Sequence, residues 1–220
     1  GVQGNGQEQL IKAITGLIPF QDGTVKLAGT EIQGMNIAQK RDAGMSYIPE
    51  DRMIDGSAPA ASIQDNLIST CYEQPKYSGK IFLKQNVIRE ESQELIERFS
   101  IKTQSEKEKV SALSGGNIQK VVVAREWNNK PKLMIAEQPT RGIDIGAKAE
   151  IQQVVLDLAS QGMGVVFISS ELEEVVRLSD DIEVLKDRHK IAEIENDDTV
   201  SQATIVETIA NTNVNTGKEA

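Results

Sequence analysis

The sequence predicts an α/β fold with a mostly parallel sheet, a small antiparallel β region and a helical subdomain. Two entirely apolar runs, residues 133–136 and 165–168, have the length of buried strands, and a stretch of helical periodicity lies between them. Apolar strands that alternate with helices are typical of a parallel sheet covered on both faces. The expected organisation is one domain, 1–210, with core segments 1–60 and 113–200, a helical insertion at about 60–112 and a polar tail at 211–220.

The N-terminal half is expected to hold one helix, several short strands and the helical insertion. The first helix has apolar residues at helical spacing, namely Leu10, Ile11, Ile14 and Leu17. An Asp-Gly turn at 22–23 follows, and 24–32 and 45–49 are predicted strands. The insertion is polar and helical in character. Its apolar stripe consists of Leu95, Ile96 and Phe99.

The C-terminal half alternates helices with strands and then ends in a hairpin. One helix is predicted at 117–128, before the strand 133–136, and an amphipathic helix begins near Ala147. The apolar runs 182–185 and 191–194 flank a polar turn, 186–190, that contains His189. We expect that histidine to be a solvated turn residue.

The composition excludes several classes of protein. Of the 220 residues, 39% are hydrophobic and 26% charged, which is ordinary for a globular chain. A net charge of -9 argues against nucleic acid as a partner. The single cysteine, Cys71, and the single histidine exclude a disulfide framework and a zinc cluster, and they fit a reducing cytoplasm. No apolar run approaches the ~20 residues that span a bilayer.

The strongest chemical signal is a Leu-Ser-Gly-Gly-Asn run at the start of a predicted helix. Adjacent glycines let a backbone approach a phosphate, and the free N–H groups and dipole of the following helix attract that anion. The alternative is a glycine-rich helix start without a ligand, since serine is a good N-cap. The candidate nucleotide-binding residues of this run are Leu113, Ser114, Gly115, Gly116 and Asn117.

A second glycine-rich run occupies residues 1–8. The phosphate-loop pattern G-x-x-x-x-G-K-[ST] needs Lys to reach the phosphates and Ser or Thr to hold Mg²⁺. Gln7 and Glu8 stand at those two positions, and Glu8 would repel a phosphate. We interpret the run as a degenerate phosphate loop, with a plain tight turn into a helix as the alternative. Its candidate nucleotide-binding residues are Gly1, Gly4, Asn5, Gly6, Gln7 and Glu8.

Further motifs resemble those of one family. Leu-Met-Ile-Ala-Glu-Gln-Pro-Thr at 133–140 and Pro-Thr-Arg-Gly-Ile-Asp at 139–144 are similar to the Walker B and D-loop region of ATP-binding-cassette (ABC) ATPases, with 113–116 as their LSGG signature. The runs at 47–52 and 168–175 resemble the second cassette of bacterial simple-sugar and nucleoside importers. The resemblance extends from Gly1 to about Glu195 and implies a P-loop NTPase-like core that binds ATP and Mg²⁺.

Five positions depart from the pattern that the resemblance implies. The family's Asp-Glu pair is Glu137-Gln138 here, and an amide cannot act as a general base. The remaining departures are Gln7, Glu8, Ser170 in place of the switch histidine, and Glu50 in place of a glutamine. The candidate residues from the resemblance are Glu137, Gln138 and Ser170 as catalytic positions, Glu50 and Asp144 as nucleotide-binding, and Glu8 and Glu137 as Mg²⁺ ligands.

We therefore expect a cassette whose own site is inactive but whose LSGG signature completes the ATP site of a second ABC cassette, which shares ATP and Mg²⁺ with it. The other expected partners are membrane permease subunits, docked at 47–65, and indirectly a substrate-binding protein; nucleic acid is not expected. The expected location is peripheral, on the cytoplasmic face of the membrane.

Alternatives remain at this point. The chain could be a catalytically active ABC ATPase domain, a soluble ABC ATPase not linked to transport, or a binding module that kept only the fold. The Glu-Gln-Pro-Thr form at 137–140 resembles the nucleoside branch of these importers slightly more than the pentose or galactose branch. Because Gly1 already lies in a motif whose preceding strand is missing, we expect the chain to be part of a longer protein.

Overall fold

A computed structural model of the chain describes residues 4–20, 22–197 and 199–211. Gly1 and most of the predicted tail at 211–220 lie outside them; only Asn211 of the tail is described, and it ends the last helix. The elements are, in order, α1 (Gln7–Thr15), β1 (Lys26–Leu27), β2 (Thr30–Glu31), α2 (Ile37–Asp42), β3 (Met45–Ile48), α3 (Ile63–Ile68), α4 (Gln85–Arg98), a 3-10 turn (Val110–Ala112), α5 (Gly115–Asn128), β4 (Leu133–Glu137), α6 (Ile145–Ser160), β5 (Gly164–Ile168), α7 (Leu172–Leu178), β6 (Asp181–Lys186), β7 (His189–Glu195) and α8 (Gln202–Asn211).

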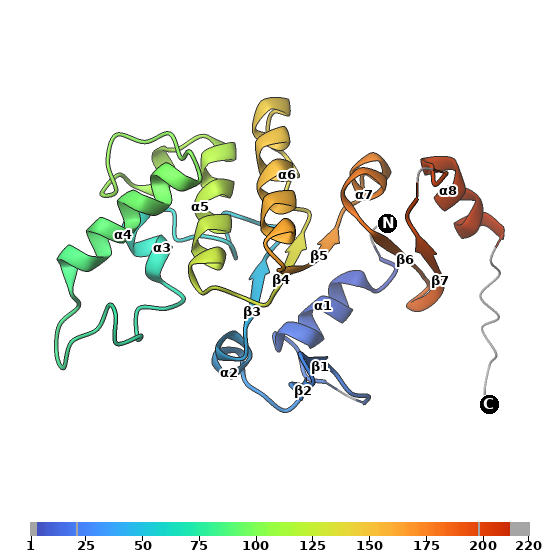
Figure 1. The fold of residues 1–220 in the computed structure, drawn as a ribbon, viewed down its shortest axis with the longest axis horizontal. Helices are drawn as coiled ribbons and strands as arrows, with labels where there is room; N and C mark the ends of the chain where they lie inside the picture. The colour runs from blue at the N-terminus through green and yellow to red at the C-terminus, as the bar shows by residue number, and fades with distance from the viewer. Residues whose placement is uncertain (1–3, 21, 198, 212–220) are drawn as a thin grey trace.

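The central sheet is parallel, with the strand order β3-β4-β5 (Figure 1). Side chains alternate across it, as the period of two in a strand requires. Met134 and Ala136 face a core cluster that includes residues of α5 and α6, whereas Ile135 packs in a second cluster with Ile11 of α1 and Met45. The predicted α/β class is confirmed, and helices cover both faces of β4.

The outer strand β5 is less buried than its apolar sequence predicts. Among the described residues it pairs only with β4, and its other edge carries no strand. Val166, in its middle, is 42% exposed. Full burial on both faces requires a neighbour on each edge as well as covering helices, so the expectation of two covered faces fails here.

The C-terminal hairpin is confirmed, but its turn is tighter than predicted. Asp187 and Arg188 alone form it, and both have positive φ, 49° and 66°. Two consecutive residues of positive φ match the right-handed twist of the flanking strands. His189 therefore lies at the start of β7, opposite Lys186, and not in the turn.

The helical subdomain is only partly helical. Between α3 and α4, residues 69–84 form turns and an isolated bridge between Ser78 and Leu83. Pro75 and Gly79 in this stretch both disfavour a helix. Of the predicted stripe in α4, Leu95 and Phe99 are buried, which confirms its core-facing side. A separate small cluster, Ile68, Cys71, Tyr77 and Ile88, holds the turns against α4.

None of the helices that the structure describes is both long and apolar enough to cross a membrane.

Candidate functional site

A cavity of about 540 Å³ opens where β3 and β4 end, beside the first turn of α1. Ligands of α/β proteins bind at this edge because the loops that leave parallel strands meet there. Three predicted site residues, Glu8, Glu50 and Glu137, line it together. Its wall carries the carboxylates Glu8, Glu50, Asp51, Asp55 and Glu137 and the cations Lys12, Arg52 and Arg141. Carboxylates outnumber cations, so the wall opposes a polyanion such as a triphosphate.

The described part of the phosphate loop packs against the C-terminal hairpin. The backbone N–H of Arg188 donates to the Asn5 carbonyl at 3.0 Å, and that of Asp187 donates to Asn5 Oδ1 at 3.1 Å. Gly6 has a φ of +100°, and a Cβ on it would lie 3.1 Å from the Arg188 Cα. Gly6 thus serves a close approach between two backbones, and both oxygens of Asn5 already accept hydrogen bonds.

Glu8 and Glu137, two carboxylates of the cavity wall, are each paired with a side chain next to them. Glu8 forms an ion pair with Lys12, one turn later in α1, at 2.6 Å. Glu137 is 5% exposed and accepts the Tyr47 hydroxyl at 2.5 Å. Burial and this bond both raise the pKa of Tyr47, so its proton stays in place as a donor.

The third pairing joins two predicted catalytic positions. The side-chain oxygen of Gln138 accepts hydrogen bonds from the backbone N–H of Ser170 at 3.1 Å and from its hydroxyl at 3.2 Å. The backbone N–H of Gln138 also donates to the Ile168 carbonyl at 2.8 Å, and its φ is 48°. The surrounding structure must hold a non-glycine residue in this left-handed conformation. Gln138 and Ser170 therefore form a joint between the ends of β4 and β5.

The cavity does not fit a Mg²⁺–triphosphate group. Mg²⁺ is usually held by one or two carboxylates together with substrate phosphates. Here Glu8 is neutralised by Lys12, Glu137 is bonded to Tyr47, and the wall has an excess of negative charge. Within 4–20, 22–197 and 199–211, no group of three or more His, Cys, Asp and Glu side chains is placed to hold a metal ion.

The signature run lies at the N-terminus of α5 and differs from the cavity in character. Ser114 is the N-cap residue but makes no side-chain cap; its hydroxyl accepts the Asn117 side-chain amide at 2.9 Å. Asn117 in turn accepts the backbone N–H of Lys102 at 2.8 Å. Leu113 packs against the main core. The Ser114 side chain therefore does not cap the first-turn N–H groups of α5. A helix start that binds an anion needs such uncapped N–H groups.

The two signature glycines have different roles. A Cβ on Gly116 would lie 2.4 Å from the Ala147 Cβ of α6, so this glycine lets the two helices pack closely. A Cβ on Gly115 would meet only the guanidinium of Arg52, at 3.0 Å. The sequence predicted phosphate approach for both, but Gly116 is needed for packing.

Arg52 joins three segments that the sequence shows only as separate motifs. Its guanidinium donates to the Arg141 carbonyl at 2.8 Å and to the Gly142 carbonyl at 3.0 Å, while lying beside Gly115. The Arg141 side chain forms an ion pair with Glu50. The segment 50–52 thereby fixes the D-loop next to the signature, a role that the sequence reading of Pro-Glu-Asp-Arg missed.

Asp144 caps a helix. Its carboxylate accepts the backbone N–H of Ala147 at 3.0 Å, and this bond, the largest cause, lowers the pKa of Asp144. α6 begins directly after it, at Ile145, whose side chain is 88% exposed. The D-loop is thus short and anchored at both ends.

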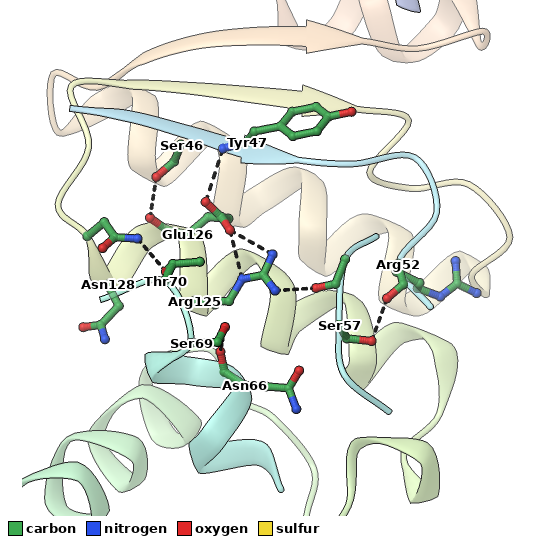
Figure 2. Close-up of polar contacts among 12 residues, drawn as sticks. Ser46, Tyr47, Arg52, Ser57, Asn66, Ser69, Thr70, Arg125, Glu126 and Asn128 are labelled. Atoms are coloured by element: carbon green, nitrogen blue, oxygen red, sulfur yellow. Dashed lines mark hydrogen bonds and ion pairs between the residues drawn. The ribbon is translucent and has the colours of Figure 1, made fainter. Parts of the chain in front are cut away.

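A buried carboxylate connects α5 to the sheet and to the segment after β3 (Figure 2). Glu126 is fully buried and accepts a hydrogen bond from the Tyr47 backbone N–H at 3.2 Å. Arg41 also donates to this carboxylate, at 2.8 Å. Arg125 binds the same carboxylate and also donates to the Gly56 carbonyl at 2.7 Å. The segment after β3 is therefore joined to α5 by a charged network that is costly to break.

A second buried carboxylate, Glu174 of α7, connects the D-loop to β5. It accepts the Thr140 hydroxyl at 2.9 Å, the Ser169 hydroxyl at 2.6 Å and the Gln152 amide at 2.7 Å. Burial acts to raise the pKa of Glu174, but these hydrogen bonds outweigh it and hold the pKa below its usual value.

Residues 1–141 match the family model described as "ABC transporter". The chain is 50% identical, over its whole length, to the fructose import ATP-binding protein FruK of Bifidobacterium longum, of which it covers 42%. It is 37% identical to the nucleoside import ATP-binding protein NupA of Lactococcus lactis, over 85% of this chain and 37% of that protein. The fold is similar to that of a nucleotide-free ATP-binding cassette from an ABC transporter, with a TM-score of 0.75 and 21% identity over 96% of this chain and 81% of that one. The chain thus spans less than half the length of these curated relatives.

Proposed function

Because the chain belongs to the ABC transporter ATP-binding family, we propose that it is the second, C-terminal cassette of an importer subunit and that its own nucleotide site is inactive. The relatives named above are import ATP-binding proteins more than twice its length, which leaves room for another cassette.

The observation that carries this proposal is the internal pairing of the altered residues. Gln138 binds Ser170, Glu8 binds Lys12, and Glu50 binds Arg141. A working site keeps its general base and its metal carboxylates available to water, Mg²⁺ and phosphate. In this chain the corresponding positions hold the loops together instead.

The signature supports a role in trans. ABC cassettes pair head to tail, so that the LSGG of one faces the ATP bound to the other. The first turn of α5 lacks a side-chain cap, and Arg52 and Asp144 hold the neighbouring D-loop in place. ATP and Mg²⁺ would therefore be bound chiefly by the second cassette and shared across the interface, where this chain contributes backbone N–H groups and the Ser114 hydroxyl.

A simple sugar is the proposed cargo class. Identity to the fructose import relative is 50%, against 37% for the nucleoside import relative. This difference supports sugar over the nucleoside preference drawn from Glu-Gln-Pro-Thr. Nucleosides remain the second candidate, since the shared motifs lie in the ATP-binding machinery and not in a cargo pocket.

We further propose that membrane permease subunits dock on the segment 47–65 and that a substrate-binding protein acts through them. The chain would then lie on the cytoplasmic face of the membrane. Support comes from Met53 and Ile54, which are 41% and 78% exposed and lie in a loop connected to α5 by Arg125. Ile63, at the far end of the segment, is fully buried, so a reporter cysteine belongs at Ile54.

The decisive experiment compares Gly115→Asp with Gln7→Ala in the full-length subunit assembled with its permease. A carboxylate at Gly115 would lie against the Arg52 guanidinium and beside the proposed place of the partner's triphosphate. It would disturb the Arg52 contacts to the D-loop and repel phosphate, so we expect ATPase activity to fall by at least about 100-fold. Gln7→Ala should stay within about twofold of wild type, because Gln7 belongs to the inactive site. Equal losses would contradict the division of labour, and ATPase activity of the isolated subunit that Gln7→Ala abolishes would favour an active cassette.

A further inference from the structure

We propose that the turn at 78–83, between α3 and α4, inserts its apolar tip into an anionic membrane surface. Ile81 and Phe82 form the tip and are 84% and 80% exposed. The segment lies at the outer edge of the helical subdomain, away from the central sheet (Figure 1). This contact is separate from the nucleotide site and does not depend on which cassette hydrolyses ATP.

The tip stands on a rigid base. The Gly79 N–H donates to the Phe82 carbonyl at 2.9 Å, and the Lys84 N–H donates to the Tyr77 carbonyl at 2.7 Å. Tyr77 is 1% exposed, and its hydroxyl donates to Glu91 at 2.8 Å and accepts the Asn128 amide at 2.9 Å. Binding through a preorganised turn loses little conformational entropy.

The local charge is opposite to that of the chain as a whole. The net charge is -9, yet 74–89 contains no Asp or Glu. Its cations are Lys76, Lys80, Lys84 and Arg89. Two of them pair with acids outside the segment, Lys76 with Glu91 and Arg89 with Glu106. The Lys84 ammonium donates to the Pro75 carbonyl at 2.7 Å and keeps its positive charge at the base of the turn. The Lys80 ammonium, next to the apolar tip, is left to attract anionic headgroups.

Lipid fits this surface better than a protein partner does. A stable protein interface buries about 800 Å² on each side, far more than two side chains on a narrow turn provide. Tyr72, 46% exposed, lies at the base of the turn, where its carbonyl accepts the Ser78 hydroxyl at 2.5 Å. Aromatic side chains favour the headgroup level beside an inserted apolar residue. Affinity need only be modest, because a permease already holds the subunit near the bilayer.

The test is flotation of the purified full-length subunit with vesicles of phosphatidylcholine alone or mixed with phosphatidylglycerol. We expect binding to the anionic vesicles only. Ile81→Ser/Phe82→Ser should weaken it at least about tenfold, and Lys80→Glu about tenfold. The matched control is Val206→Ser, which removes an exposed apolar side chain from α8 and should leave vesicle binding unchanged.

A second measurement reports directly how deeply the tip of the turn enters the bilayer. In Phe82→Trp, lipids brominated on the acyl chain should quench the fluorescence of the new tryptophan. In the control Val206→Trp they should not. Equal binding to neutral vesicles, or full binding by the double-serine variant, would overturn the proposal. So would loss of the permease from detergent-solubilised transporter on changing the tip, because the tip would then be a protein contact.

Discussion

The phosphate-loop half and the signature half of this cassette share the edge formed where the strands end, but they differ in how their polar groups are used. On the first side, Glu8, Gln138 and Glu137 are bonded to Lys12, Ser170 and Tyr47. On the second side, the N-terminus of α5 lacks a side-chain cap and is supported from behind by the Arg52 clamp on the D-loop.

The difference teaches that residues which depart from a catalytic motif can form an ordered set of contacts of their own. Glu8, Glu137 and Gln138 are each engaged with another side chain of this protein, and in the proposal these pairs take the place of contacts to Mg²⁺, water and phosphate. A buried polar group is costly unless it is bonded, and the Tyr47 hydroxyl meets this requirement for the buried Glu137 without a ligand. The second half keeps its polar backbone available, which agrees with a ligand supplied from outside.

The largest effect is expected from crowding the signature half. Gly116→Val would place atoms where the Ala147 Cβ lies 2.4 Å away, so α5 and α6 must separate. We expect a loss of about 3 kcal/mol in the free energy of unfolding and of nearly all transporter ATPase activity. Denaturant unfolding and steady-state hydrolysis measure the two effects. Gly34→Val is the control, since nothing lies within 4 Å of its Cβ position; equal destabilisation by both would show that the close helix contact is unimportant.

Acidification should loosen the signature half next. Because the folded-state pKa of Glu174 lies below its usual 4.5, its bonds stabilise the protein above that pH, and this contribution disappears as the pH falls through the lowered value. We expect Glu174→Gln to cost about 2 kcal/mol at neutral pH and to flatten the decline of stability below pH ~4.5. Parallel stability curves for wild type and variant between neutral and acid pH would refute the assignment.

Removing the clamp should cost function more than stability. Arg52→Ala releases the Arg141 and Gly142 carbonyls and should lower transporter ATPase activity about tenfold, equivalent to ~1.4 kcal/mol. Arg52→Lys keeps the positive charge but not the forked geometry of the guanidinium. Its ATPase activity should lie between that of the wild type and that of Arg52→Ala. A uniform loss of stability with unchanged turnover per folded molecule would make Arg52 merely structural.

The smallest effect is expected from restoring the first half in part. Gln138→Glu/Ser170→His returns a general base and a switch histidine, yet Gln7 and Glu8 still lack the phosphate-loop charge and hydroxyl. We expect no increase in ATPase activity of the full-length subunit. A clear increase would mean that the cavity already binds Mg²⁺–ATP and would revive the alternative of an active cassette.

The sequence was sufficient for the parts that depend on local periodicity. Residues 133–136 and 165–168 are strands, and the helix at Gly115–Asn128 begins at the signature. These follow from apolar patterning and glycine chemistry. The hairpin was also predicted, but with a turn of too many residues, 186–190. The positive φ of Asp187 and Arg188, which makes a two-residue turn possible, has no distinctive sequence signal.

The sequence was insufficient for interactions between distant segments. Glu50, Glu137 and Ser170 were identified as departures from a motif, but their partners lie 91, 90 and 32 residues away. Only the fold shows that Arg141, Tyr47 and Gln138 complete them. Gly116 illustrates the same limit, since its packing against Ala147 cannot be distinguished from a phosphate-binding role by residue type alone.

In the part of the chain that the structure describes, the outer edge of β5 pairs with no strand, and this has a consequence for handling the protein. Its backbone N–H and C=O groups present a template for any passing strand, and Val166 adds an apolar side chain there. A polypeptide limited to residues 1–220 would recruit chaperones during synthesis and self-associate once concentrated. The soluble yield would then depend more on how long the β5 edge stays exposed than on the free energy of unfolding.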